Sequence, residues 1–351
     1  YAWGKGIDTS LVAYYAKATS ALQEDDDKPY AELWMGTHPS GPAVPLTDTG
    51  DLMGPGLTEL LEQNPSLLGK NVKGPQLPFL LKVLSVSTAL SIQAHPDRSL
   101  APRLHTDDPS HYPDANHKPE MTIALTPFRA LCGFRPLVEV VDAAKKYSEL
   151  AQILGPEHLR SLEEASVSQD AEVTRPALQA AFSRVMRADP AQVADLLEVL
   201  IERLAAQSES SNLDRLLLLL AEQYPGDIGS FAAIFLNDIV LMPGDALFLA
   251  ANEPHAYIAG DCIECMAASD NVVRAGLTPK FRDVDTLVSM LSYRTESPST
   301  HMLRSTPFRD VPHTKLYEAP APECRVLITS VSDTSTVSVP PLSTPSVAIC
   351  T

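Results

Sequence analysis

Four side chains of types that bind metal ions stand at the ends of apolar stretches in this sequence. Gln93 and His95 close a long apolar run, and residues two apart on a strand point to the same face of a sheet. Glu120 follows a polar loop broken by prolines, and His255 follows a turn before another apolar stretch. Imidazole and carboxylate groups bind zinc and similar ions well, and an amide oxygen can be a weaker ligand.

One glutamate, two histidines and a glutamine would place a single negative charge against a divalent cation. The site would stay net positive, so the metal could polarise a carbonyl or hydroxyl oxygen as a Lewis acid. Each residue also has a plainer interpretation, since a lone histidine at a strand end is more often a hydrogen-bonding partner than a ligand. Residue types alone therefore predict a metal-dependent β-barrel enzyme, with hydrogen-bonded strand ends as the open alternative.

The stretch 262–281 adds charged side chains to these candidates. They are Glu264, Asp270, Arg274 and Lys280. Arg274 and Lys280 could instead be solvated surface charges. Cys262 and Cys265 have the spacing of a redox or zinc pair, but on a strand they would fall on opposite faces. We interpret both cysteines as small core residues.

The composition limits the partners of the chain. Its 351 residues carry 27 basic and 44 acidic side chains, a net charge of -17 that argues against nucleic acid and anionic membranes. The longest wholly apolar helical run, at 216–221, is far shorter than a membrane span, and the first residues show no signal-peptide pattern. Five irregularly spaced cysteines fit a reducing compartment. These features predict a cytoplasmic protein.

Strands and turns must position the candidate side chains. Short apolar runs predict strands at 31–35, 79–87, 90–95 and 121–126. Between residues 136 and 227 the spacing becomes helical, and Asp189 followed by Pro190 is a typical helix start. β-like segments return from residue 228. The pattern predicts a mainly β fold with an α-helical insertion.

The segment after residue 297 is rich in serine, threonine and proline, and it predicts strands at 325–332 and 334–341. We therefore expect three units: residues 1–135 with 228–297, residues 136–227, and residues 298–351. The chain stops within a strand-like segment, so we expect the last unit to be truncated.

Eight sequence words together resemble the type I mannose-6-phosphate isomerases, also called phosphomannose isomerases. They are YAWGK (1–5), KPYAELWMGTHPSGP (28–42), LPFLLKVLSV (77–86), LSIQAHPD (90–97), HYPDANHKPEM (111–121), LTPFRALCGFRP (125–136), QYPGDIG (223–229) and PHAYIAGDCIECMAASDNVVRAGLTPKF (254–281). The words are long, occur in the family's order and span nearly the whole chain.

The resemblance implies a cupin (jelly-roll) catalytic core, an inserted helical domain and a second, here partial, jelly-roll. It also implies one zinc ion per chain. The family holds its zinc with the glutamine and histidine of QAH, the glutamate of KPE and the histidine of PHAY. In this sequence these residues are Gln93, His95, Glu120 and His255.

The implied reaction interconverts mannose 6-phosphate and fructose 6-phosphate through a cis-enediol, which supplies mannose 6-phosphate for GDP-mannose synthesis and glycosylation. A base must move a proton, and the candidates are Glu264, Asp270 and Lys118, the last only in its neutral form. For the phosphate we expect Arg274, Lys280 and Ser91. The family's motif marks Arg274 as essential, either for the phosphate or for enediolate charge.

Two other functions remain open at this point. One is a cupin metal oxygenase, against which the glutamine ligand and the Arg274/Lys280 pair argue. The other is a cupin that binds a sugar phosphate without activity. The only partner we expect is a small-molecule sugar phosphate, and we expect a monomer.

Overall fold

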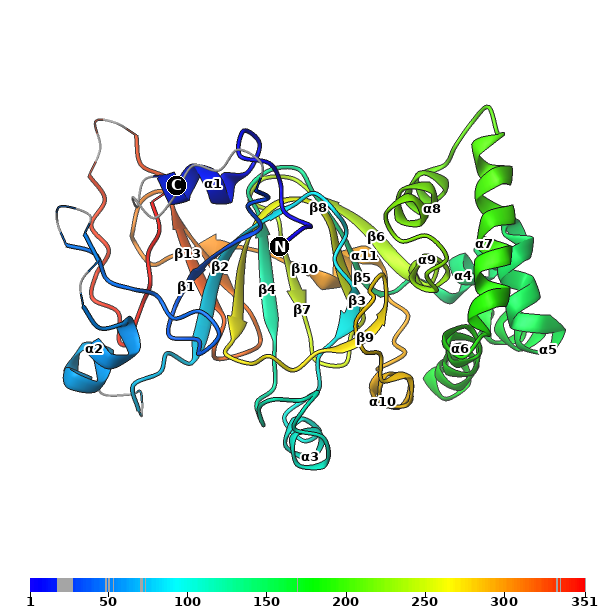
Figure 1. Ribbon diagram of the computed structural model, residues 1–351, viewed down its shortest axis with the longest axis horizontal. Coiled ribbons are helices and arrows are strands. Elements are labelled where there is room, and N and C mark those ends of the chain that lie inside the picture. Colours follow the sequence, from blue (N-terminus) through cyan, green and yellow to red (C-terminus); the bar gives the residue numbers. More distant parts are fainter. Residues whose placement is uncertain are drawn as a thin grey trace.

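The computed structural model describes residues 1–17, 28–47, 49, 51–52, 54–69, 72, 74–168, 170–332, 334 and 336–350. Figure 1 shows three parts side by side along the longest axis: a small C-terminal sheet, a central β-structure and a cluster of helices. The mainly β fold with an α-helical insertion is therefore confirmed.

A ten-stranded, branched antiparallel sheet forms the centre. Its main path runs β1 (Glu32–Met35), β2 (Phe79–Val86), β8 (His255–Ala267), β4 (Glu120–Ala124), β7 (Ala246–Leu249) and β10 (Met302–Leu303). The branches are β3 (Ile92–Ala94), β9 (Val273–Gly276), β5 (Phe128–Phe134) and β6 (Leu236–Leu241). The long strand β8 joins the two sets, because its second half pairs with β2 and β4 and its first half pairs with β3 and β5.

Strand β8 changes partners at Gly260. This residue has a backbone φ of +116°, which residues other than glycine rarely adopt. A Cβ atom there would lie 2.5 Å from the carbonyl oxygen of Pro127. Glycine thus allows the strand to turn from one half of the β-structure to the other, and the candidate ligand His255 lies at the start of this bent strand.

Side chains alternate across β8 as a strand requires. Cys262 packs with Leu84 and Tyr257 inside the central β-structure. Cys265 packs on the opposite face against Tyr317 of the C-terminal sheet. Both cysteines are buried free thiols, so the prediction that they are core residues rather than a redox or zinc pair is confirmed.

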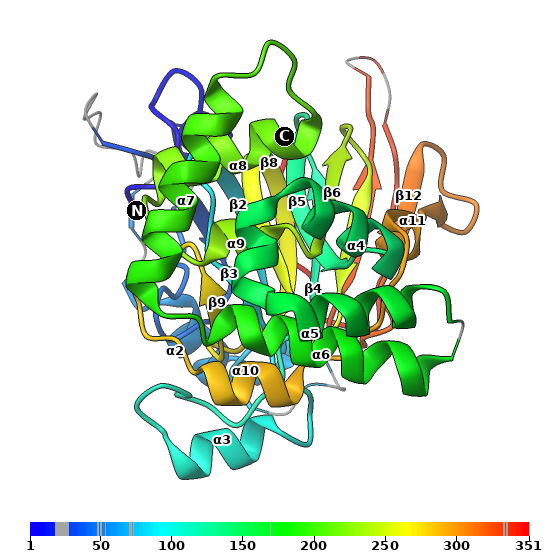
Figure 2. The same ribbon diagram turned by 90° about the vertical axis from the view of Figure 1, so that its right-hand side faces the viewer.

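The inserted helices cover the other side of the central β-structure (Figures 1 and 2). They are α4 (Leu137–Lys146), α5 (Ser148–Ser166), α6 (Ala171–Met186), α7 (Pro190–Ala205) and α8 (Asn212–Gln223), followed by the short α9 (Gly229–Ala233). Asp189 caps α7 by accepting hydrogen bonds from the N–H groups of Ala191 and Gln192, as predicted. One apolar core joins helices and sheet, in which Phe134 of β5 packs edge-on against Phe182 of α6.

Shorter elements complete the described chain. The helices are α1 (Leu11–Lys17), α2 (Leu57–Gln63), the 3-10 helix η1 (Pro65–Leu68), α3 (Ala101–Asp107), α10 (Val284–Met290) and α11 (Pro298–His301). The C-terminal sheet contains β11 (Thr306–Pro307), β12 (Thr314–Glu318) and β13 (Arg325–Thr329). In the residues that the structure describes, no helix is long and apolar enough to cross a membrane.

The prediction of a strand at 334–341 is wrong, since the described residues of this range form no strand. Val339 is exposed, and Pro340 and Pro341 have no N–H group to donate to a neighbouring strand. β propensity without a pairing partner does not make a strand. The division into three units stays a prediction; α4 to α8 lie within 136–227, whereas β10, at the start of the expected third unit, pairs with β7 of the central sheet.

Candidate metal centre and active site

Three of the predicted ligands meet inside the central β-structure. Nε2 of His95 lies 3.3 Å from one carboxylate oxygen of Glu120, and Nε2 of His255 lies 3.3 Å from the other. One nitrogen or oxygen from each residue lies within 4.8 Å of the others, and all three residues are buried. Such a group has the size and the donor atoms to hold a single metal ion.

The second nitrogen of each ring fixes its orientation. Nδ1 of His95 lies 2.7 Å from the carbonyl oxygen of Asn271, and Nδ1 of His255 lies 3.0 Å from that of Glu253. A proton on each Nδ1 leaves the Nε2 lone pair free, which is the tautomer that a metal-ligating histidine uses. Both Nε2 atoms and Oε2 of Glu120 are buried without a hydrogen-bond partner. Unpaired buried polar atoms are costly, so these three atoms fit a bound cation.

Gln93 lies next to this group through strand pairing. It is opposite His255 on β8 and opposite Arg274 on β9, with a register shift between Ile92 and Gln93. Residues directly opposite in an antiparallel pair project to the same side of the sheet. The backbone thus brings the glutamine and the arginine to the face on which His255 lies.

Lys118 contributes positive charge at the buried group. Its Nζ lies 3.1 Å from Oε1 of Glu120, and its side chain is almost completely buried. Burial alone would raise the pKa of the Glu120 carboxyl, but Lys118 and the two histidines lower this pKa well below its usual value. Burial lowers the pKa of His95 to about 4. At neutral pH the site therefore holds a carboxylate and a neutral imidazole at His95, the charge states that metal ligands require.

Glu264 lies close to Glu120 on the same face. It pairs with Thr122 of β4, two positions along from Glu120. The hydroxyl of Tyr257 donates a hydrogen bond to its Oε1 at 2.9 Å, and Nζ of Lys82 lies 3.3 Å from its Oε2. Burial and the charge of Glu120 raise the pKa of Glu264. A raised pKa is the direction of shift that favours a carboxylate as a general acid and base.

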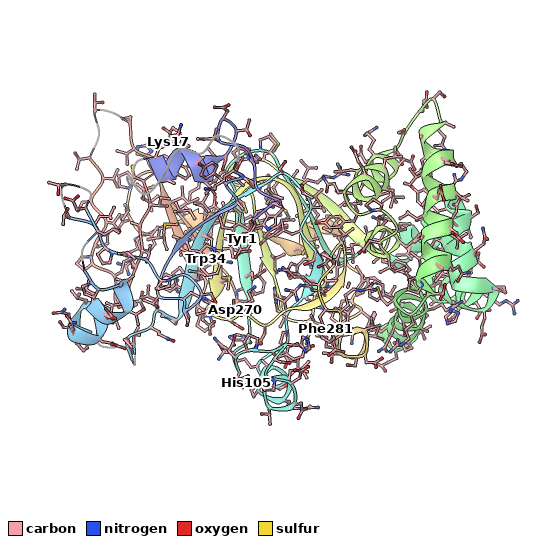
Figure 3. The ribbon with its side chains drawn as sticks, in the orientation of Figure 1. Tyr1, Lys17, Trp34, His105, Asp270 and Phe281 are labelled. Atoms are coloured by element: carbon pink, nitrogen blue, oxygen red, sulfur yellow. The ribbon has the colours of Figure 1, made fainter. Side chains whose placement is uncertain are left out.

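Asp270 occupies a different environment. It follows β8 at the lower end of the central β-structure in the view of Figure 3, and it is exposed. Its carboxylate lies 3.5 Å from Nε2 of His38 and accepts a hydrogen bond from the hydroxyl of Ser40 at 3.1 Å. Of the three predicted bases, Glu264 and Lys118 are buried beside Glu120, whereas Asp270 lies at the surface.

The expected phosphate-binding residues differ in burial. Arg274 is half-buried on β9, burial lowers its pKa, and its guanidinium makes no hydrogen bond or ion pair within the described residues. Ser91 is half-buried just before β3, and Lys280 is exposed beyond β9. An unpaired, partly buried guanidinium on the face of a metal group is available to an anionic substrate.

Sequence reasoning missed several residues that support the site. Lys82 and Tyr257 hold Glu264, and Lys82 also lies over the ring of Trp34, with 4.6 Å from Nζ to the centroid. A lone lysine inside the apolar run FLLKVL was the available signal, because a buried cation needs an acidic partner.

The C-terminal segment also reaches the site. Glu323 lies 3.1 Å from Nε2 of His117, which directly precedes Lys118. The thiol of Cys324 donates a weak hydrogen bond to the carbonyl oxygen of Pro119. These partners are more than 200 residues apart in the sequence. No local pattern could therefore have indicated them.

A jelly-roll core with an inserted helical unit and a buried His–Glu–His group defines a cupin-type metal-binding protein. Residues 1–137 match the catalytic domain of type I phosphomannose isomerase, and residues 153–236 match the helical insertion domain of the same family. The mannose-6-phosphate isomerase of Homo sapiens is 47% identical over 340 residues, covering 94% of this chain and 80% of that protein. The chain belongs to the type I phosphomannose isomerase family.

Solved structures agree with this assignment. A mutant of phosphomannose isomerase from Salmonella typhimurium superimposes with a TM-score of 0.76 and 29% identity, covering 92% of this chain and 79% of that one. A zinc-bound mannose 6-phosphate isomerase has a TM-score of 0.74, 29% identity and the same coverage. Both comparisons confirm the predicted cupin core with a helical domain.

Proposed function

We propose that this protein is a zinc-dependent isomerase that interconverts mannose 6-phosphate and fructose 6-phosphate. The observation that carries the proposal is the buried group of His95, Glu120 and His255, whose unpaired Nε2 and Oε2 atoms face one another in a chain of this family. The zinc-bound relative and the activity named for the human relative support the choice of metal and of substrate.

One zinc ion per chain would be held by His95, Glu120 and His255, with Gln93 as the fourth ligand. When bound, zinc supplies a Lewis acid beside the sugar oxygens, which favours negative charge on the enediolate. A neutral glutamine leaves the centre more positive than a second carboxylate would. The strand register of Gln93 with His255 supports its inclusion.

The isomerisation moves a proton between neighbouring carbons of the open-chain sugar by way of a cis-enediol. We assign this transfer to Glu264, because it is buried near Glu120 and carries a raised pKa. Lys82 and Tyr257 orient its carboxylate. Lys118 would keep Glu120 ionised. Asp270 lies at the surface, so it would contact the substrate only from the solvent side.

Arg274 is the cation that we assign to the substrate anion, with Ser91 as a hydrogen-bond donor and Lys280 as a second, exposed charge. A dianionic phosphate needs such a local cluster in a protein of net charge -17. The same net charge supports a protein that does not bind nucleic acid. We further propose a cytoplasmic monomer that supplies mannose 6-phosphate for GDP-mannose synthesis and glycosylation.

Incubation with mannose 6-phosphate, followed by NMR, tests the proposal. The metal-loaded protein should produce fructose 6-phosphate, and Arg274→Met should lose at least tenfold in kcat/KM. Binding of mannose 6-phosphate without product would indicate an inactive sugar-phosphate-binding cupin. Consumption of dioxygen with oxidation of the sugar would indicate an oxygenase.

A further inference from the structure

The helical unit returns to the central sheet through residues 223–229, which we call the return segment. Its sequence, QYPGDIG, begins at the last residue of α8 and ends at the first residue of α9. None of its side chains has a part in the chemistry described above. It nevertheless contacts the chain just before β3, which carries Gln93, and just after β9, which carries Arg274.

Asp227 holds the end of β9. Its Oδ1 accepts hydrogen bonds from the backbone N–H groups of Gly229 at 2.6 Å and Leu277 at 2.7 Å, and its Oδ2 accepts one from Thr278 at 3.3 Å. Leu277 has a φ of +55°, which is unfavourable for a branched side chain. The carboxylate therefore stabilises a strained turn that lies three residues after Arg274 and three before Lys280.

The backbones of the return segment and of β9 also touch. A Cβ atom on Gly276 would lie 2.5 Å from Cα of Gly229 and 2.8 Å from Oδ1 of Asp227. A Cβ atom on Gly229 would lie 2.5 Å from the backbone nitrogen of Leu277. Two glycines are thus required for this approach, which is too close for any other residue.

The first two residues of the return segment hold the chain before β3. Oε1 of Gln223 accepts a hydrogen bond from the N–H group of Ala89 at 2.9 Å. The hydroxyl of Tyr224 donates a hydrogen bond to the carbonyl oxygen of Ala89 at 2.6 Å. Ala89 is fully buried and lies two residues before Ser91, so the segment fixes the entry to β3.

Strands β3 and β9 pair with each other, and Gln93 lies opposite Arg274. We propose that the return segment positions this strand pair for the substrate, with Asp227 acting through the backbone of Leu277 and Thr278 on Arg274. The inference rests on the proposed function, and it gives the helical insertion a part in substrate binding. Asp227 is a positioning residue, since it acts on the site through another chain segment.

Asp227→Asn tests this role, because asparagine keeps the size of the side chain but loses its charge and turns a donor toward the backbone N–H groups. The KM for mannose 6-phosphate should rise about tenfold, and competitive inhibition by inorganic phosphate should weaken by a similar factor. The kcat should change less than about threefold and the zinc content should stay at one per chain, because the metal group itself is not altered.

Asp214→Asn is the matched control. Asp214 lies in the helical unit, where it accepts hydrogen bonds from Lys146, Tyr147 and Ser211. The control should lower the melting temperature while KM stays within about twofold of the wild type, since a general loss of stability does not act on Arg274. Equal KM values for Asp227→Asn and Asp214→Asn would overturn the proposal.

Tyr224→Phe provides a second test that does not depend on folding of the Asp227 variant. It removes one hydroxyl and should raise KM about threefold with little change in stability. If the wild type is active and Tyr224→Phe has the same KM, the positioning role is contradicted while the proposed function stands. A zinc-loaded wild type without turnover contradicts the proposed function instead.

Discussion

Nε2 of His95 lies 3.3 Å from Oε1 of Glu120, and neither residue is more than 1% exposed. The imidazole is held from behind by a backbone carbonyl group, so its lone pair faces the carboxylate without a proton between them. Two acceptors that face each other in a buried site repel unless a cation lies between them. Lys118 already offsets part of this repulsion at Oε1 of Glu120, and we expect a bound metal ion to offset the rest and to stabilise the folded protein.

Removal of metal should therefore destabilise the protein. A ligand that binds only the folded state at a free concentration of 1,000 Kd stabilises it by about 4 kcal/mol. Calorimetry at neutral pH should show a lower melting temperature after chelation and full recovery with zinc. In His255→Ala the zinc-dependent shift should be largely lost; an equal shift in this variant would place the metal elsewhere.

Gln93→Ala tests the fourth ligand. Loss of one protein ligand should weaken zinc binding at least tenfold, which a competition titration with a chromogenic chelator measures. Ser91→Ala, just before the same strand, is the control, and its zinc affinity should equal that of the wild type. Unchanged zinc affinity in Gln93→Ala would remove Gln93 from the ligand set.

Glu264→Gln tests the assignment of the base. The amide keeps the shape of the side chain but cannot take up the proton, so kcat should fall by a factor of about 10² to 10⁴. Asp270→Asn should cost less than about tenfold. NMR of sugar isolated from deuterium oxide reports the transfer directly, and slower deuterium incorporation in Asp270→Asn than in Glu264→Gln would reverse the assignment.

Asp214 should make the stability of the helical unit depend on pH. Burial alone would raise the pKa of Asp214, but the hydrogen bonds from Lys146, Ser211 and Tyr147 lower it well below the ordinary 3.8. The unfolded chain therefore takes up this proton first. The stabilisation is complete above about pH 4 and is lost as the pH falls below it.

Asp214→Asn should remove this pH dependence together with about 1–3 kcal/mol of stability at neutral pH. Urea denaturation followed by circular dichroism, at several pH values between 6 and 3, measures both effects. Parallel curves for the wild type and the variant over this range would show that Asp214 does not set the pH dependence.

Local patterns were sufficient to locate several of the helices and strands. Asp189 and Pro190 fixed the start of α7, and the apolar runs located β2 and β4 to within a residue or two. The resemblance to the family implied that His95, Glu120 and His255 meet, whereas their places at strand ends alone left hydrogen-bonded strand ends open as the alternative. Their distances depend on strand pairing and on the bend of β8 at Gly260, which a single sequence does not specify.

Long-range partners could not be predicted in the same way. Lys82 belongs to an apolar strand, and only the register of β2 with β8 places it opposite Glu264. The contact of Asp227 with Leu277 joins segments that lie 50 residues apart. Conversely, the propensity at 334–341 predicted a strand that no partner stabilises. Contacts between segments far apart in the sequence, rather than local propensity, decided each of these cases.

The most direct test of the account is a zinc titration of metal-free protein with mannose 6-phosphate as substrate. Formation of fructose 6-phosphate, measured by a coupled assay, should rise from background and reach its maximum at one zinc per chain. Glu120→Gln should stay near background at the same zinc concentration. Full activity in the metal-free protein, or no activity at one equivalent of bound zinc, would contradict the account.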